Sequence, residues 1–241
     1  MSNKTRGIIL HTTNYSETSL VVKIYTESSG LSSYIVSGVR SKNSKFKSNI
    51  FQPLSLVELV ASGKPGQSLK RITDIQLSPP LSGISGDIIK SSIAIFLAEI
   101  IYRSIREEEP NSNLFGFLNN SIQILDVCQD NCSRFHIFFM IRFSRHLGFF
   151  PHGDCIPGIT IFDLEEGFFT RNYPSHGRYL DFQHADLLFR LMHSDFENYR
   201  DIEISMNEMK ILLNSLVTYF EIHHTHGSLI RSHKILEEVL G

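Results

Sequence analysis

The sequence predicts an α+β protein with more than one domain: a small five-stranded barrel, then an all-α helical domain with a short irregular or hairpin insertion. Three observations support this prediction. Five short runs rich in β-branched residues fill the first 77 positions, with no helical pattern between them. A segment rich in proline and glycine follows, and beyond it apolar residues recur every three or four positions. We therefore predict domains at residues 1–80 and 81–241.

The predicted strands are short, and most of them alternate between apolar and polar residues. In the second, Val22 and Ile24 alternate with Lys23 and Tyr25, which is typical of a half-buried strand. Glycine and proline in the connecting segments allow the chain to reverse. Such strands favour a small barrel such as the OB-fold, although they do not separate it from an SH3-like barrel. The predicted strands are residues 7–13, 19–26, 31–39, 54–61 and 69–77.

Residues 38–53, here called the basic segment, contain no acidic residue and have neither helical nor strand periodicity. We expect a loop that meets a polyanion, because spaced cations can hold phosphates while an aromatic such as Phe46 or Phe51 stacks on an unpaired base. The alternative is a solvated loop whose lysines only keep the protein soluble. The four cations of the basic segment are Arg40, Lys42, Lys45 and Lys47.

Charge is distributed unevenly along the chain. Residues 1–75 hold ten Lys and Arg against four Asp and Glu, a net of +6, whereas the rest hold thirteen against twenty-one, a net of −8. The overall value of −2 therefore hides a basic front portion. Lys70 and Arg71, on the fifth predicted strand, join the candidate polyanion-binding residues by charge and position.

Residues 78–86, with adjacent prolines and two glycines, are expected to continue neither strand nor helix, and helical spacing begins after them. Ser205 and Glu208 form a capping-box signature for one later helix. An irregular insertion at about 148–180 contains strand-like stretches at 158–162 and 167–170. The predicted helices are residues 87–109, 113–128, 132–147, 181–194, 205–223 and 228–240.

The sequence contains no apolar run near the roughly 20 residues that span a bilayer, and it begins without a signal-peptide pattern. We expect a cytoplasmic protein. Its three cysteines are too few for a disulfide framework, which fits a reducing compartment.

Catalytic motifs are missing from the sequence, so we predict a protein that is not an enzyme. Residues 62–68 resemble a phosphate-binding loop only superficially, because no Gly-Lys-Ser/Thr ends them and a strand follows. Cys128 and Cys132 have a spacing that metal ligands use, but such a pair at a helix junction is more often small core residues. His223, His224 and His226, at the end of a predicted helix, are expected to satisfy its carbonyls or to pack at the surface. We predict no metal and no cofactor.

The predicted helix 132–147 is unusually aromatic and carries Arg142 and Arg145. The favoured interpretation is that its phenylalanines belong to a core and its cations face solvent. The alternative is a groove for an apolar peptide with an acidic terminus, in which the two arginines hold carboxylates.

Several short motifs also follow one another along the chain. They are Gly7-Ile-Ile-Leu-His11, Tyr15-Ser-Glu-Thr-Ser-Leu20, Ile24-Tyr-Thr26, Gly38-Val-Arg40, Gln52-Pro53, Phe96-Leu-Ala-Glu99, Glu109-Pro110, Leu114-Phe115, Leu147-Gly-Phe-Phe-Pro151, and Ser232 with Lys234 and Leu236. In order and spacing this set resembles the bacterial recombination mediator family RecO.

The resemblance implies an OB-fold, a helical domain and no bond-breaking chemistry. It implies a bacterial, nucleoid-associated protein for DNA repair and recombination that binds single- and double-stranded DNA and anneals complementary strands. The implied partners are the acidic, apolar C-terminal tail of the single-strand binding protein SSB, RecR and, functionally, RecA. On this resemblance Arg40, Lys42, Lys45 and Lys47 match the family's DNA-contacting loop.

The chain departs from the family at one point. Many members carry Cys-x-x-Cys-Gly after the Leu-Gly-x-x-Pro motif and a second cysteine pair farther on, which together bind zinc. Here Cys155 stands alone and no pair follows, so we expect the insertion to fold without zinc.

The leading hypothesis is thus a DNA-repair mediator. The first rival is a non-catalytic adaptor whose helical domain binds a peptide, and the second is a metal-dependent nuclease, for which the sequence offers no carboxylate cluster.

Overall fold

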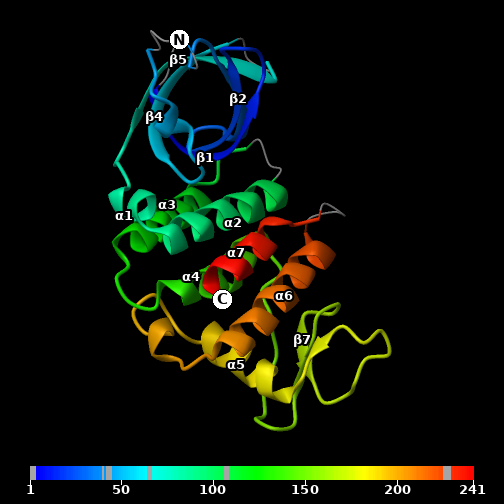
Figure 1. Ribbon diagram of the computed structural model, residues 1–241. Coiled ribbons are helices and arrows are strands. Elements are labelled where there is room, and N and C mark those ends of the chain that lie inside the picture. Colours follow the sequence, from blue (N-terminus) through cyan, green and yellow to red (C-terminus); the bar gives the residue numbers. More distant parts are fainter. Residues whose placement is uncertain (1–3, 40, 42–44, 64–66, 106–108, 225–228) are drawn as a thin grey trace. The chain divides into compact units, whose positions relative to one another are not determined.

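The structure, a computed structural model, describes residues 4–39, 41, 45–63, 67–105, 109–224 and 229–241 (Figure 1). The chain forms two compact units, Met1–Cys128 and Gln129–Gly241. Within these described ranges, the first contains the barrel together with three α-helices, and the second contains the later helices and a small sheet. The predicted boundary at residue 80 separates the barrel from those first helices, and it stays a prediction.

The barrel closes in the order β1-β2-β3-β5-β4. Its pairs are antiparallel except for β3 and β5, which run parallel. This closed five-stranded barrel is OB-like, so the predicted fold class is confirmed (Figure 1). The strands are β1 (Lys4–Asn14), β2 (Leu20–Thr26), β3 (Gly30–Val36), β4 (Leu56–Ser62) and β5 (Leu69–Leu77).

Alternation along β2 shows how the sequence builds the barrel wall. Val22 and Ile24 are fully buried in the barrel interior, while Lys23 between them is only half-buried. Tyr25 is also buried, because its ring stacks on Phe115 of helix α3 (Ser112–Val127) at 6.3 Å between centroids. A helix therefore covers part of the outer barrel face that strand periodicity alone predicts to be exposed.

Helix α1 (Ser82–Gly86) lies inside the proline- and glycine-rich segment, so the expectation that this segment holds no helix is wrong for these residues. The end of α3 stabilises it, because the Asp126 carboxylate accepts the Ile84 backbone N–H at 2.7 Å. Gly83 permits this approach, since a Cβ there would lie 1.9 Å from the Asp126 carbonyl oxygen. Lys90 of α2 (Ile88–Ser104) donates to the same carbonyl at 2.8 Å.

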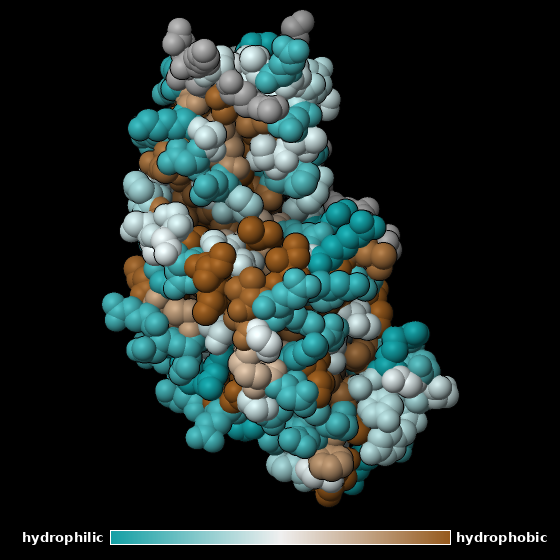
Figure 2. All heavy atoms as spheres, in the orientation of Figure 1, coloured by the Kyte–Doolittle hydropathy of each residue, from teal (hydrophilic) through white to brown (hydrophobic). Residues whose placement is uncertain are grey.

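The second unit is built around α4 (Phe135–Leu147), which packs against α5 (Phe182–Met192) and α6 (Met206–His223). The last helix is α7 (Ser232–Leu240). The four phenylalanines of α4 are buried, as the favoured interpretation of this helix predicts; they are Phe135, Phe138, Phe139 and Phe143. Hydrophilic side chains cover most of the visible face of this unit (Figure 2).

The capping box at the start of α6 is confirmed. The Ser205 hydroxyl accepts the Glu208 backbone N–H, and the Glu208 carboxylate accepts the Ser205 backbone N–H at 2.8 Å. Because both contacts are local in sequence, the motif was readable without the structure.

The insertion forms a three-stranded sheet in the order β7-β6-β8, one strand more than the predicted hairpin. Its strands are β6 (Ile161–Asp163), β7 (Phe168–Thr170) and β8 (Tyr179–Leu180). The buried carboxylate of Asp163 holds the turn after β6 by accepting the backbone N–H groups of Glu165 and Glu166. His176 lies 3.3 Å from the same carboxylate. Strand β8 was not predicted, because a strand of two residues is too short to show periodicity in the sequence.

Candidate nucleic-acid interface

The structure places four of the six predicted DNA-binding cations, since Arg40 and Lys42 lie outside the described residues. Lys45 and Lys47 flank Phe46, just before a short 3-10 turn at Ser48–Phe51. The other two, Lys70 and Arg71, lie on β5. Whether DNA binds these residues stays a prediction, but their geometry differs from one cation to the next.

Lys45 is tied to the barrel. Its Nζ donates to the Thr73 carbonyl oxygen of β5 at 2.9 Å and lies 3.2 Å from the Asp74 carboxylate. It also lies 5.1 Å from the centroid of the Phe46 ring. The ion pair is exposed on both sides, so solvent weakens it. Lys45 therefore anchors the basic segment to β5, and its charge is partly neutralised.

Lys47 and Lys70 are differently placed. In the part of the chain that the structure describes, neither ammonium group makes a hydrogen bond or an ion pair. Arg71 donates to the Ser37 hydroxyl at 3.2 Å, a contact that leaves its charge unbalanced. Lys47 and Arg71 are exposed and Lys70 is half-buried. These three cations can bind a phosphate without first breaking an ion pair.

Phe46 and Phe51 do not provide the predicted stacking surface. Both are buried, 7% and 5% exposed, and belong to the apolar core of the barrel. The Phe51 carbonyl oxygen accepts the Thr12 hydroxyl of β1 at 3.2 Å, which holds this part of the basic segment against the barrel. The expectation failed because the basic segment has no periodicity from which to read the direction of a side chain.

A hydroxyl-lined hollow of about 350 Å³ lies beside Lys70. Next to it, Lys23 of β2 donates to Ser33 of β3 at 2.7 Å. Hydroxyl donors around an ammonium group can bind a phosphate oxygen. The parallel pairing of β3 with β5 creates this hollow from distant segments, so no motif marks it. Its lining residues are Ser28, Ser29, Ser32, Ser33, Gln67, Ser68, Lys70 and Pro110.

Arg142 and Arg145, the predicted partner-binding cations of α4, have different surroundings. Arg142 is half-buried and donates to the Ser194 carbonyl oxygen, and burial together with the nearby Arg145 lowers its pKa. Arg145 is exposed, with its guanidinium 4.0 Å from the centroid of the Phe150 ring. Arg145 is thus the more accessible of the two.

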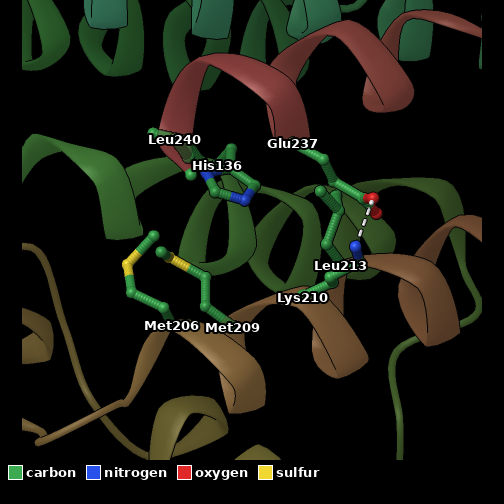
Figure 3. A pocket seen from close by; sticks show the side chains of 8 residues that line it. His136, Met206, Met209, Lys210, Leu213, Glu237 and Leu240 are labelled. Carbon is green, nitrogen blue, oxygen red and sulfur yellow. Dashed lines mark ion pairs between the residues drawn. The ribbon is translucent and has the colours of Figure 1, made fainter.

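A small pocket lies between α4, α6 and α7, where the methionine side chains of α6 and Leu240 surround His136 (Figure 3). Lys210 and Glu237 form an ion pair of 3.5 Å at this pocket. Its volume of about 30 Å³ holds only one or two water molecules. The pocket therefore gives little support to the adaptor alternative.

His136 predicts an acid-sensitive step in the stability of the second unit. Complete burial lowers its pKa to about 3. Below its ordinary pKa of 6.5 the unfolded chain gains a proton that the folded chain excludes, so stability falls as pH falls from 6.5 toward 3. Between pH 7 and pH 5 we expect this residue to cost about 2 kcal/mol. Urea unfolding at both pH values should show a smaller loss for His136→Leu than for the native protein; equal losses would contradict the assignment.

Within the described residues, no group of three His, Cys, Asp or Glu side chains could hold a metal ion; His226 lies outside them. Cys155 is free and half-buried, and burial raises the pKa of its thiol. Cys128 is buried, as predicted for a small core residue, and Cys132 is half-buried. The two are disulfide-bonded, which the sequence analysis did not predict. Cysteine spacing alone does not reveal such a bond. That the insertion folds without zinc stays a prediction, and stoichiometric zinc in the purified protein would contradict it.

None of the helices that the structure describes has both the length and the apolar character needed to cross a membrane.

Two family models together match most of the chain. The model described as "Recombination protein O N terminal" matches residues 1–80, and "Recombination protein O C terminal" matches residues 85–229. Curated relatives agree over the full length. The DNA repair protein RecO of Phocaeicola vulgatus is 38% identical over 241 residues, all of both chains. The RecO protein of Bacteroides fragilis is 38% identical over 99% of each chain. The RecO protein of Flavobacterium psychrophilum is 34% identical over the full length of both chains.

Fold and surface together define a class of protein in which an OB-like barrel, rich in exposed cations, precedes a set of helices. The matches at both ends of the chain identify the family within this class. The chain belongs to the RecO family of DNA repair and recombination proteins.

Proposed function

We propose that this chain is a recombination mediator that binds single- and double-stranded DNA through the cations of its barrel unit. In this proposal it anneals complementary strands and, together with RecR, helps to load RecA onto DNA coated with SSB. The observation that carries the DNA-binding step is that three of the predicted cations, Lys47, Lys70 and Arg71, have no carboxylate partner among the residues that the structure describes. Membership of the RecO family supports the remaining steps.

Electrostatics supplies the mechanism of binding. Each cation that meets a phosphate releases condensed counterions, so affinity falls steeply as the salt concentration rises. Contacts to the DNA backbone carry no base code, so the protein should bind with little sequence preference. The hollow beside Lys70 adds hydroxyl donors to this backbone site.

Annealing follows from the same contacts, since two complementary strands repel each other until their phosphates are neutralised. A protein surface that neutralises phosphates lowers this repulsion and raises the chance that the strands pair. No covalent bond forms or breaks, so the proposed activity is not enzymatic. Its proposed setting is the bacterial cytoplasm.

Partner binding belongs to the second unit in this proposal. The SSB tail is acidic and apolar, and Arg145 offers an exposed cation beside the Phe150 ring. Arg142 is less available to bind a carboxylate, because its guanidinium already donates a hydrogen bond to the Ser194 carbonyl oxygen.

An annealing assay tests the proposal. Complementary oligonucleotides, one labelled with a fluorophore and one with a quencher, should pair faster with the protein than without it, and less so at high salt. Strands recovered after incubation with magnesium or manganese should be intact, whereas cleavage would favour the nuclease rival. Peptide binding without any binding to DNA would favour the adaptor.

A further inference from the structure

The barrel has five phenylalanine and tyrosine residues within residues 1–80, and only one of them meets solvent. Tyr15 is 64% exposed. The other four are at most 7% exposed; they are Tyr25, Tyr34, Phe46 and Phe51. Any stacking of a DNA base on a barrel tyrosine or phenylalanine therefore falls to Tyr15.

The loop that presents Tyr15 is held by short-range hydrogen bonds between β1 and β2. The backbone N–H groups of Tyr15 and Ser16 both donate to the Ser19 carbonyl oxygen, at 3.0 and 3.3 Å. The Ser19 N–H returns a hydrogen bond to the Ser16 hydroxyl at 3.2 Å. Within the described residues the phenol makes no hydrogen bond and its ring no aromatic contact. The ring is thus presented on an ordered loop, which lowers the entropy lost on binding.

The strand register places this loop at the same end of the barrel as Lys70 and Arg71. Asn14, which precedes Tyr15, pairs with Leu20, and Leu20 pairs with Val36. Ile35, the neighbour of Val36, pairs with Arg71. Counted across the sheet from β1 through β2 and β3 to β5, Arg71 is three strand spacings from the end of β1 that precedes Tyr15. Three spacings correspond to roughly 15 Å. That distance lies within the reach of a site that covers ~4–16 nucleotides on an OB-fold.

We propose that the Tyr15 ring stacks on an unpaired base of single-stranded DNA while the barrel cations hold the neighbouring phosphates. This inference rests on the proposed function and adds to it a residue that distinguishes single strands from duplex. Bases within a duplex already stack on both faces, so they offer no face to Tyr15. An unpaired base does, and stacking of this kind tolerates every base.

Affinity measurements on three DNA ligands test the inference. Tyr15→Ala should weaken binding of a single-stranded oligonucleotide by roughly 5- to 150-fold. It should leave the affinity for duplex, the affinity for an abasic strand of equal length, and the salt slope unchanged. Tyr15→Phe, which keeps the ring, should bind nearly as the native protein does. The matched control is Tyr173→Ala, at a tyrosine 65% exposed in the second unit, and it should change nothing.

A fluorescent reporter gives a second readout, because the chain contains no tryptophan. Tyr15→Trp supplies a single one, whose emission should be quenched by single-stranded DNA and not by the abasic strand. Tyr173→Trp should respond to neither.

The outcomes separate the two proposals. Native binding of single strands that Tyr15→Ala leaves intact overturns the stacking role alone. An equal loss on all three ligands overturns it too, since a general effect is not stacking. If the native protein binds no DNA at all, the proposed function fails and the inference with it.

Discussion

Replacing Arg40, Lys42, Lys45 and Lys47 together with alanine is expected to flatten the salt dependence of single-stranded DNA binding. Each neutralised phosphate contributes about 0.7 to the slope of log Kobs against log salt on single strands, so four contacts contribute nearly 3. Lys45 already lies 3.2 Å from the Asp74 carboxylate, which reduces its share. We therefore expect a decrease of between about 2 and 3, measured by titration of a fluorescent oligonucleotide at several salt concentrations.

Single variants refine this result. Lys47→Ala should lower the slope by about 0.7, because Lys47 has no partner within the described residues. Lys45→Ala should lower it by less, since its charge is shared with Asp74.

The control for the quadruple variant removes the same charge from the second unit, at Arg171, Arg190, Lys210 and Lys234. Its slope should match that of the native protein. If the quadruple variant of the basic segment kept the native slope, the DNA site would have to lie elsewhere.

Phe46→Ala is expected to destabilise the barrel by about 3–5 kcal/mol, the usual cost of removing a buried phenylalanine ring. Phe46 is 7% exposed and packs in the barrel core, so its loss leaves a cavity between the basic segment and the strands. Urea unfolding measures this cost as a lower midpoint at an unchanged slope.

Phe46→Leu separates a core role from a stacking role. Leucine fills most of the volume, so stability should fall by no more than about 1.5 kcal/mol. Because the ring faces the core, single-stranded DNA should bind Phe46→Leu as tightly as the native protein. Loss of DNA binding in this variant without loss of stability would restore the stacking role to Phe46. Tyr15→Ala should show the opposite pattern, with weaker binding and native stability.

Local patterns predicted much of the fold. Alternation along Val22 and Ile24 marked a barrel strand, helical spacing in 132–147 marked the core of the second unit, and Ser205 with Glu208 marked a helix start. Each of these signals needs only neighbours in the chain. The prediction of secondary structure failed where a residue distant in sequence stabilises the element. Helix α1 is an example, because Asp126, more than forty residues away, stabilises it.

For the candidate site, the sign and the position of the charge follow from residue types alone, because ionisation depends on residue type and residues 1–75 carry a net positive charge. Which of these side chains remain available for binding depends on contacts in the folded protein. In the closed barrel Phe46 packs in the core, and Lys45 forms an ion pair with Asp74 of β5. The parallel pairing of β3 with β5 places serines beside Lys70. Burial and ion pairing depend on segments that are distant along the chain, and no spacing in the sequence encodes them.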